Sequence, residues 1–235
     1  MITLAFDTTA KVASVAVTRD GVALGYYSID NGLTQSELIL PMAESLLASL
    51  KLDISKVGLF ACSVGPGSFT GVRIGVSVVK GLAFGRDIPC CAVSTLEALA
   101  ENASSLDAII VPCMDARRSQ VYSATFESTG EGLRRLTEDR AISLASLAEE
   151  LKAYEGRDIY LVGDGYAVAY KALTEAGVKL SRTPTLLINE NAASVAKVAE
   201  RMYERGESVS ESALSPVYLR LPQAERERLE RLGKE

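Results

Sequence analysis

The 235-residue chain contains no histidine, and this absence excludes several classes of catalytic and metal site. Without an imidazole, the chain can form neither a serine–histidine–aspartate triad nor a cysteine–histidine pair, and it lacks a histidine general base. Metal motifs built on paired histidines are excluded for the same reason. Tryptophan is also absent, without a comparable consequence for function.

Cysteine residues are few, and none of them lies in a C-x-x-C pair. Zinc sites and disulfide frameworks use other spacings, so we expect small, buried apolar side chains instead. Reduced thiols are typical of proteins of the cytosol. The four residues are Cys62, Cys90, Cys91 and Cys113.

Positive charge is in deficit, since 25 lysine and arginine residues face 30 aspartate and glutamate residues, for a net charge of −5. The chain as a whole therefore lacks the basic surface typical of nucleic-acid-binding proteins.

Long apolar runs are lacking too, because Asp7 ends the first one, and Pro66 and several glycines interrupt the uncharged run 57–72. Neither run predicts a signal peptide or a membrane span. We expect a cytoplasmic protein that does not bind membranes.

The order of predicted elements occurs twice: strand, aspartate, strand, turn, strand, helix, strand, glycine-rich loop. Asp7 follows the first strand of one half and Asp115 follows the first strand of the other. Such self-similarity indicates duplicated α/β units. In the first half we predict strands at 2–6, 14–18, 22–29, 57–64 and 90–93 and helices at 34–50, 68–84 and 95–103. In the second half we predict strands at 108–113, 121–126, from 133 onward and at 159–162, and helices at 143–153 and 191–204.

This repeat divides the chain into an N-terminal lobe, residues 1–104, and a C-terminal lobe, residues 105–220. The helix at about 191–204 is assigned to the C-terminal lobe because it follows that lobe in sequence. Residues 221–235 form a tail of mixed charge, which predicts a solvated helix or a frayed end.

Two predicted helices of the first half have an unusual composition. The helix at 34–50 carries more apolar residues than the stripe of roughly 100° that a surface helix buries. The helix at 68–84 contains several glycines, although glycine costs about 1 kcal/mol relative to alanine inside a helix. Small residues allow another helix to approach closely. These helices therefore predict a helix-mediated interface with a partner, and close packing inside the same domain is the alternative.

Three polar turns are candidate ligand sites. The turn Asp7-Thr8-Thr9 follows a strand and could hold phosphate, or Asp7 could bond its own backbone in an Asx-type turn. The loop Gly65–Gly71 precedes a helix, where an anion can bind, or it is only a tight turn. The segment Asp115–Arg118 could hold an anion through Arg117 and Arg118, or it is a turn with surface arginines.

Six segments, spread from the first strand to Arg220, carry a further signal. They are Leu4–Thr9 (LAFDTT), Val64–Gly75 (VGPGSFTGVRIG), Lys80–Ala83 (KGLA), Val93–Ala100 (VSTLEALA), Asp115–Tyr122 (DARR with VY) and Pro216–Arg220 (PVYLR). Together they resemble the TsaB family, also called YeaZ, of bacterial tRNA threonylcarbamoyladenosine biosynthesis proteins. The long glycine segment is specific to this family, whereas the Asp-Thr-Thr turn alone is not.

The resemblance implies the actin-like ATPase fold (ASKHA, ribonuclease H-like), an α/β fold with two lobes of duplicated βββαβα units. It also implies a non-catalytic scaffold subunit that is required for N6-threonylcarbamoyladenosine at position 37 of tRNAs that read ANN codons. Such a subunit pairs with and activates a TsaD-like transferase, is joined by a TsaE-like ATPase, and forms a homodimer when alone. Contact with tRNA would come mainly through the complex.

The family's pairing helices correspond to the helices at 34–50 and 68–84. We therefore expect a partner interface made by Ser36, Leu38, Met42, Leu46, Gly71, Gly75 and Val79. On this interpretation Gly75→Arg leaves the monomer folded and abolishes pairing. The sequence departs from many relatives at Gln35-Ser36-Glu37, where they have His-Ser-Glu.

The resemblance implies no catalytic residue, no metal site and no cofactor of the chain's own. Asp7, Thr8 and Thr9 would be a vestigial phosphate turn, and Asp115, Arg117 and Arg118 would make conformational or anion contacts. ATP or ADP at the partner interface stays open. The alternative is an ATP-dependent enzyme of the actin-like class, a small-molecule kinase or ATPase, in which Asp7, Thr8 and Asp115 hold Mg²⁺ and phosphates.

Overall fold

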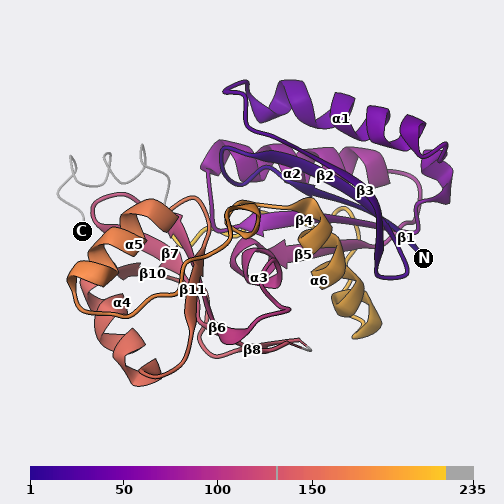
Figure 1. The fold of residues 1–235 in the computed structure, drawn as a ribbon. Coiled ribbons are helices and arrows are strands. Elements are labelled where there is room, and N and C mark those ends of the chain that lie inside the picture. The colour runs from indigo at the N-terminus through magenta and orange to yellow at the C-terminus, as the bar shows by residue number, and fades with distance from the viewer. Residues whose placement is uncertain (131, 221–235) are drawn as a thin grey trace, which may run out of the picture.

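The computed structural model describes residues 1–130 and 132–220, and it contains two β-sheets with helices against their faces (Figure 1). The predicted charged tail, 221–235, lies outside the described residues. Both predicted lobes form a sheet of their own, and the element order repeats except that, among the described residues, the second half has five strands before its helix where the first half has three.

The N-terminal sheet has the strand order β3-β2-β1-β4-β5. The first three strands are antiparallel neighbours, whereas β4 runs parallel to β1 and β5 runs parallel to β4. The parallel connections pass through helices, which is the usual reason that parallel strands are buried on both faces. The bounds are β1 (Ile2–Asp7), β2 (Ala13–Arg19), β3 (Val22–Ile29), β4 (Leu59–Gly65) and β5 (Cys90–Ser94).

The C-terminal sheet is built around β6, which pairs with β7 and β8 antiparallel and with β11 parallel. β7 and β8 pair with successive parts of β6, so the single strand predicted at 121–126 is divided in two. β10 extends the sheet beside β7 and β9 extends it beside β8. The bounds are β6 (Asp107–Asp115), β7 (Gln120–Ser123), β8 (Phe126–Thr129), β9 (Leu133–Arg135), β10 (Arg140–Ser143) and β11 (Ile159–Val162).

Helices cover both faces of the N-terminal sheet and join the two sheets. One core contains the inner sides of α1 and α2, and a second contains α6 and α3. α3 also packs against the C-terminal sheet, whose other face packs against α4 and α5. The bounds are α1 (Gln35–Ser49), α2 (Phe69–Ala83), α3 (Thr95–Glu101), α4 (Leu144–Leu151), α5 (Tyr166–Glu175) and α6 (Ala192–Glu204), with short 3₁₀ turns at Ile54–Lys56, Lys152–Tyr154 and Thr185–Leu187.

The position of α6 corrects the predicted lobe boundary. α6 follows the C-terminal lobe in sequence, but it packs on the N-terminal sheet with its small apolar side chains against Ala5 and Ala61. The buried Glu200 accepts hydrogen bonds from Thr3 at 2.9 Å and from Thr18. Both faces of the N-terminal sheet are apolar and must be buried by helices, and α1 and α2 bury only one of them. α5, which the residue pattern did not predict, covers the C-terminal sheet instead.

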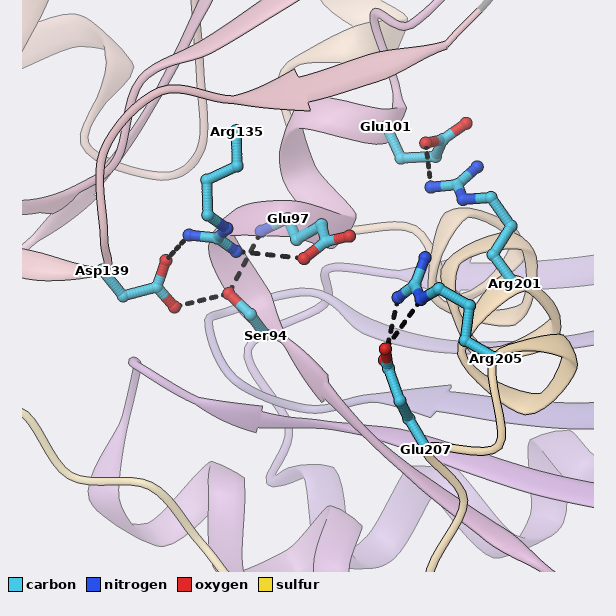
Figure 2. A network of polar contacts seen from close by, with 8 residues as sticks. All are labelled: Ser94, Glu97, Glu101, Arg135, Asp139, Arg201, Arg205 and Glu207. Atoms are coloured by element: carbon cyan, nitrogen blue, oxygen red, sulfur yellow. Dashed lines mark hydrogen bonds and ion pairs between the residues drawn. The ribbon is translucent and has the colours of Figure 1, made fainter.

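Charged side chains hold α3 between the lobes (Figure 2). Glu97 of α3 pairs with Arg135 of β9 at 3.0 Å, and Arg135 also pairs with Asp139, which accepts from Ser94. One turn further along α3, Glu101 pairs with Arg201 of α6 at 2.6 Å.

The carboxylate of Glu101 is almost fully buried and also pairs with Lys197 at 2.6 Å. Burial raises the pKa of Glu101, but the hydrogen bonds from Arg201 and Lys197 outweigh it and hold the pKa below the ordinary value. The α3–α6 contact is therefore an ionised pair at neutral pH.

Candidate functional site

The turn after β1 is closed by its own side chains. One carboxylate oxygen of Asp7 accepts from the backbone N–H of Thr9 at 2.9 Å and from the Thr9 hydroxyl at 2.7 Å. The other accepts from the Ser63 hydroxyl at 2.6 Å. The side chains of the turn are buried. This is the Asx-type turn that the sequence offered as the alternative to a phosphate site.

The glycine-rich loop and the start of α2 lie directly against this turn. The Thr8 hydroxyl donates to the Gly71 carbonyl at 2.7 Å, and the Ser68 N–H donates to the Thr9 carbonyl at 2.7 Å. A Cβ atom at Gly71 would overlap the Thr8 carbonyl oxygen, and one at Gly75 would lie 2.7 Å from the Thr8 hydroxyl oxygen. The glycines are therefore required by a contact inside the chain.

These contacts decide how well the turn fits a phosphate group. A phosphate would need N–H and hydroxyl donors, and the Thr9 N–H and both threonine hydroxyls already donate to Asp7 and Gly71. The residues of the turn thus do not fit a phosphate as its ligands. Of the three predicted cofactor residues, only Thr9 borders the open cleft described below.

The predicted partner face needs a correction. Met42 and Leu46 are 5% and 3% exposed, and Val79 is fully buried, so all three belong to the core between the helices and the sheet. Gly71 and Gly75 face Thr8, which makes the expectation for Gly75→Arg wrong, since the new side chain has no space in the monomer. Of the remaining predicted contacts, Ser36 is exposed and Leu38 is half-buried.

A different row of each helix points outward. We call this surface the outer helix face. On α1 it exposes Leu40, which is 47% exposed, and on α2 it exposes Gly81, whose added Cβ would meet no atom within 4 Å. Periodicity alone could not select this row, because each helix carries apolar residues on more than one side. The face comprises Leu40, Ser45 and Ala48 of α1 and Ile74, Ser77, Val78, Gly81 and Leu82 of α2.

A cleft of about 590 Å³ lies between the lobes. Its walls include the first residues of α2, the turn after β6, and Lys11. Gln35, which stands where many relatives have histidine, also lines it and donates to the Ala10 carbonyl at 2.6 Å.

The turn after β6 brings the predicted Asp115 and Arg117 to the cleft, whereas Arg118 is exposed and does not line it. Asp115 accepts from the Arg117 N–H at 2.7 Å, and its own N–H donates to Asp164 at 3.1 Å. Arg117, Arg118 and Ser119 all have positive φ, a conformation that is uncommon outside glycine. An anion contact at this turn stays a prediction.

Glu190 is a buried acid that the sequence gave no reason to single out. It is 3% exposed, and neither carboxylate oxygen has a hydrogen-bond partner among the described residues. Burial, followed by the negative charges of Asp7 and Asp164, raises the pKa of Glu190 well above its ordinary value. No motif surrounds Glu190, so only its position in the fold makes it notable.

The cysteines are buried, as predicted, and are not disulfide-bonded. Burial raises the pKa of Cys90 to about 11 and the pKa values of Cys91 and Cys113 to about 12, and it raises the pKa of Cys62 further. A thiol with such a pKa supplies almost no thiolate nucleophile at neutral pH.

Among residues 1–130 and 132–220, no group of three histidine, cysteine, aspartate or glutamate residues could hold a metal ion. The same residues include no helix that is long and apolar enough to cross a membrane.

Comparison with known proteins identifies the family. Residues 34–228 match the sequence profile of TsaD, described as tRNA N6-adenosine threonylcarbamoyltransferase. The tRNA threonylcarbamoyladenosine biosynthesis protein TsaB of Escherichia coli K12 is 30% identical over 92% of this chain and 94% of its own. The protein of the same name from Bacillus subtilis 168 is 35% identical over 70% of this chain and 72% of its own. The chain belongs to the TsaB family.

A solved structure of a family member supports the same assignment. The structure of YeaZ from Pseudomonas aeruginosa is 26% identical in sequence, covers 93% of this chain and 99% of its own, and superimposes with a TM-score of 0.74. The expected actin-like ATPase fold is confirmed, as is the resemblance of this chain to the TsaB family. The closed Asp-Thr-Thr turn, the cleft and the outer helix face are thus features of a TsaB chain.

Gly71 and Gly81 of α2 have opposite surroundings, so they test whether α2 packs closely against the turn after β1. Gly71→Ala should lower the free energy of unfolding by about 1–3 kcal/mol or more, because its methyl group overlaps the Thr8 backbone. Gly81→Ala should raise it by up to about 1 kcal/mol, because alanine is the better helix former and has free space there. Urea denaturation of both variants measures the difference, and equal effects at the two positions would contradict the assigned packing.

Glu190 predicts a pH dependence of stability. Because its pKa in the folded chain lies above the ordinary 4.5, Glu190 keeps its proton in the folded state after the unfolded state has lost it. Its contribution to stability is therefore complete below pH 4.5 and is lost as the pH rises toward the folded pKa, by at most about 1.4 kcal/mol per pH unit. Glu190→Gln removes this titration, so the variant should gain stability relative to the parent as the pH rises.

Urea denaturation at about pH 5 and about pH 8 measures that gain. Glu155→Gln, at an exposed position, is the matched control and should leave the pH profile of the parent unchanged. A Glu190→Gln profile parallel to that of the parent would show that Glu190 does not titrate in this way.

Proposed function

We propose that this chain is a non-catalytic subunit of the machinery that makes N6-threonylcarbamoyladenosine in tRNA, and that it acts by pairing with a TsaD-like transferase. Membership of the TsaB family supports the first part, because relatives that align over most of this chain are named tRNA threonylcarbamoyladenosine biosynthesis proteins. The outer helix face supports the second part and is the observation that carries the proposal.

The outer helix face has the properties that a helical partner requires. Leu40, Ile74 and Val78 offer apolar area on two helices that pack in one core. Ser77 and Gly81 are small and exposed, so the backbone of a partner helix can approach α2 closely. An exposed apolar surface bordered by small residues is typical of a protein–protein contact. In the absence of the transferase, we propose that a second copy of this chain occupies the same face.

The chemistry of the chain supports a non-catalytic role. There is no histidine for a general base or a paired-histidine metal site. The thiols are buried with raised pKa values, and the donors of the Asp-Thr-Thr turn are used within the chain. The alternative, an ATP-dependent enzyme, is not favoured, because the phosphate donors that it needs at Thr8 and Thr9 are occupied.

The remaining partners follow from the same proposal. A TsaE-like ATPase would join the pair, and ATP or ADP would bind at the partner interface rather than to this chain alone. The net charge of −5 gives the chain no broad positive surface, so tRNA would be held mainly by the partners. Because tRNA modification takes place in the cytoplasm, this role also places the chain there.

The decisive assay measures transfer of the threonylcarbamoyl group to tRNA. A TsaD-like transferase and its ATPase receive pre-made threonylcarbamoyl-adenylate, with and without this chain. We expect transfer only when the chain is present and no ATP turnover by the chain alone. Equal transfer without the chain would overturn the proposal.

The outer helix face is tested by Gly81→Arg, which adds a long cation where there is free space. The variant should fold, because nothing lies within 4 Å of the added Cβ, and it should lose co-purification with the transferase and the transfer activity. Ala167→Arg, at an exposed position of α5, introduces the same side chain on the other lobe and should retain both. Unchanged pairing by Gly81→Arg would exclude this face.

A further inference from the structure

The last described residues, Ser215–Arg220, form a segment that we call the strap. The strap follows Leu214, which is fully buried in the core of the N-terminal lobe. Lys80 of α2 holds this end by donating to the carbonyls of Ser212 at 3.2 Å and Leu214 at 3.0 Å. The Val217 N–H then donates to the Val64 carbonyl at the end of β4, at 2.7 Å. The start of the strap is thus fixed to the N-terminal lobe.

Tyr218 makes the next contact, on the first turn of α2. Its ring lies 4.7 Å from the ring of Phe69, and its hydroxyl accepts from Nε of Arg73 at 2.9 Å. The guanidinium of Arg73 lies 3.8 Å from the centre of the Phe69 ring. This packing of two aromatic rings and a cation holds Tyr218 at the wall of the cleft that α2 forms.

Arg220, two residues later, contacts the opposite wall. Its guanidinium donates to the Ala116 carbonyl at 3.0 Å and lies 5.7 Å from the ring centre of Tyr122. Ala116 follows β6 and Tyr122 belongs to β7, so both are parts of the C-terminal lobe. Within three residues the strap therefore passes from one lobe to the other, and both Tyr218 and Arg220 line the cleft.

The strap differs from the other links between the lobes in its exposure. Away from the strap, the lobes share α3, whose apolar side chains are buried in cores of both sheets. Tyr218 is 39% exposed and Arg220 is only half-buried. A contact that water reaches can open and close without disturbing a core.

We propose that the strap is a latch that sets the width of the cleft, with Tyr218 binding it to α2 and Arg220 binding it to the turn after β6. Release of Arg220 leaves the lobes joined through α3 and lets the cleft open. Loss of Tyr218 alone leaves the strap attached to the N-terminal lobe through Lys80 and the Val217 N–H, so Arg220 is the contact that opens the latch. This inference concerns the free chain and does not depend on the proposed partner.

Distances between spin labels on the two lobes test the latch in the full chain. Glu204→Cys at the end of α6, which packs on the N-terminal sheet away from the outer helix face, and Lys171→Cys on α5 supply exposed thiols, whereas the four native cysteines are buried and remain unlabelled. Double electron–electron resonance then gives the distribution of distances between the lobes. In Arg220→Ala the distribution should become broader than in the parent, Tyr218→Ala should broaden it less because Lys80 and the Val217 N–H still hold the strap, and the double variant should match Arg220→Ala.

Arg205→Ala is the matched control, because Arg205 carries the same side chain as Arg220 and its ion-pair partner, Glu207, lies on the same segment after α6. Its distance distribution should equal that of the parent. Far-UV circular dichroism and a cooperative thermal transition check that each variant is folded. A distribution that is unchanged in Arg220→Ala, with the fold intact, would overturn the proposal.

Discussion

The close approach of α2 to the turn after β1 is the constraint on which the other features depend. Because Gly71 and Gly75 leave no gap, the threonines of the turn bond to the helix and to Asp7 instead of a ligand. The same contact fixes which side of α2 is buried. Its opposite side becomes the outer helix face, and its first turn becomes both a wall of the cleft and the support for Tyr218.

The two lobes are joined more closely than a repeat of separate units would require. α3 belongs to the N-terminal lobe in sequence but contributes apolar side chains to the core of the C-terminal sheet. Glu97 and Glu101 on this short helix pair with arginines of β9 and α6. Two charges one turn apart on the same helix thus hold it to β9 of the C-terminal sheet and to α6 on the N-terminal sheet, and the cleft lies elsewhere between the lobes.

The sequence was sufficient for features that depend on local pattern. The duplicated element order, the bounds of α1 and α2 within one residue, and the buried cysteines follow from periodicity, capping residues and composition. Features that depend on distant contacts could not be predicted. An apolar helix with several candidate rows gives no sign of which row meets the sheet, so the sequence predicts Met42 and Val79 at the partner interface although both lie in the core. The burial of Glu190 and the packing of α6 on the N-terminal sheet depend on the path of the chain after β11.

The return of α6 to the first sheet has a consequence for how the chain is made. During synthesis, β1 to β5 leave the ribosome with one face covered by α1 and α2, while the face that includes Ala5 and Ala61 waits for residues 192–204. The first lobe therefore cannot complete its core until nearly the whole chain has emerged. Contacts of such sequence separation slow folding and leave apolar surface open to aggregation. In this chain the repeat of the architecture does not give two independent folding units.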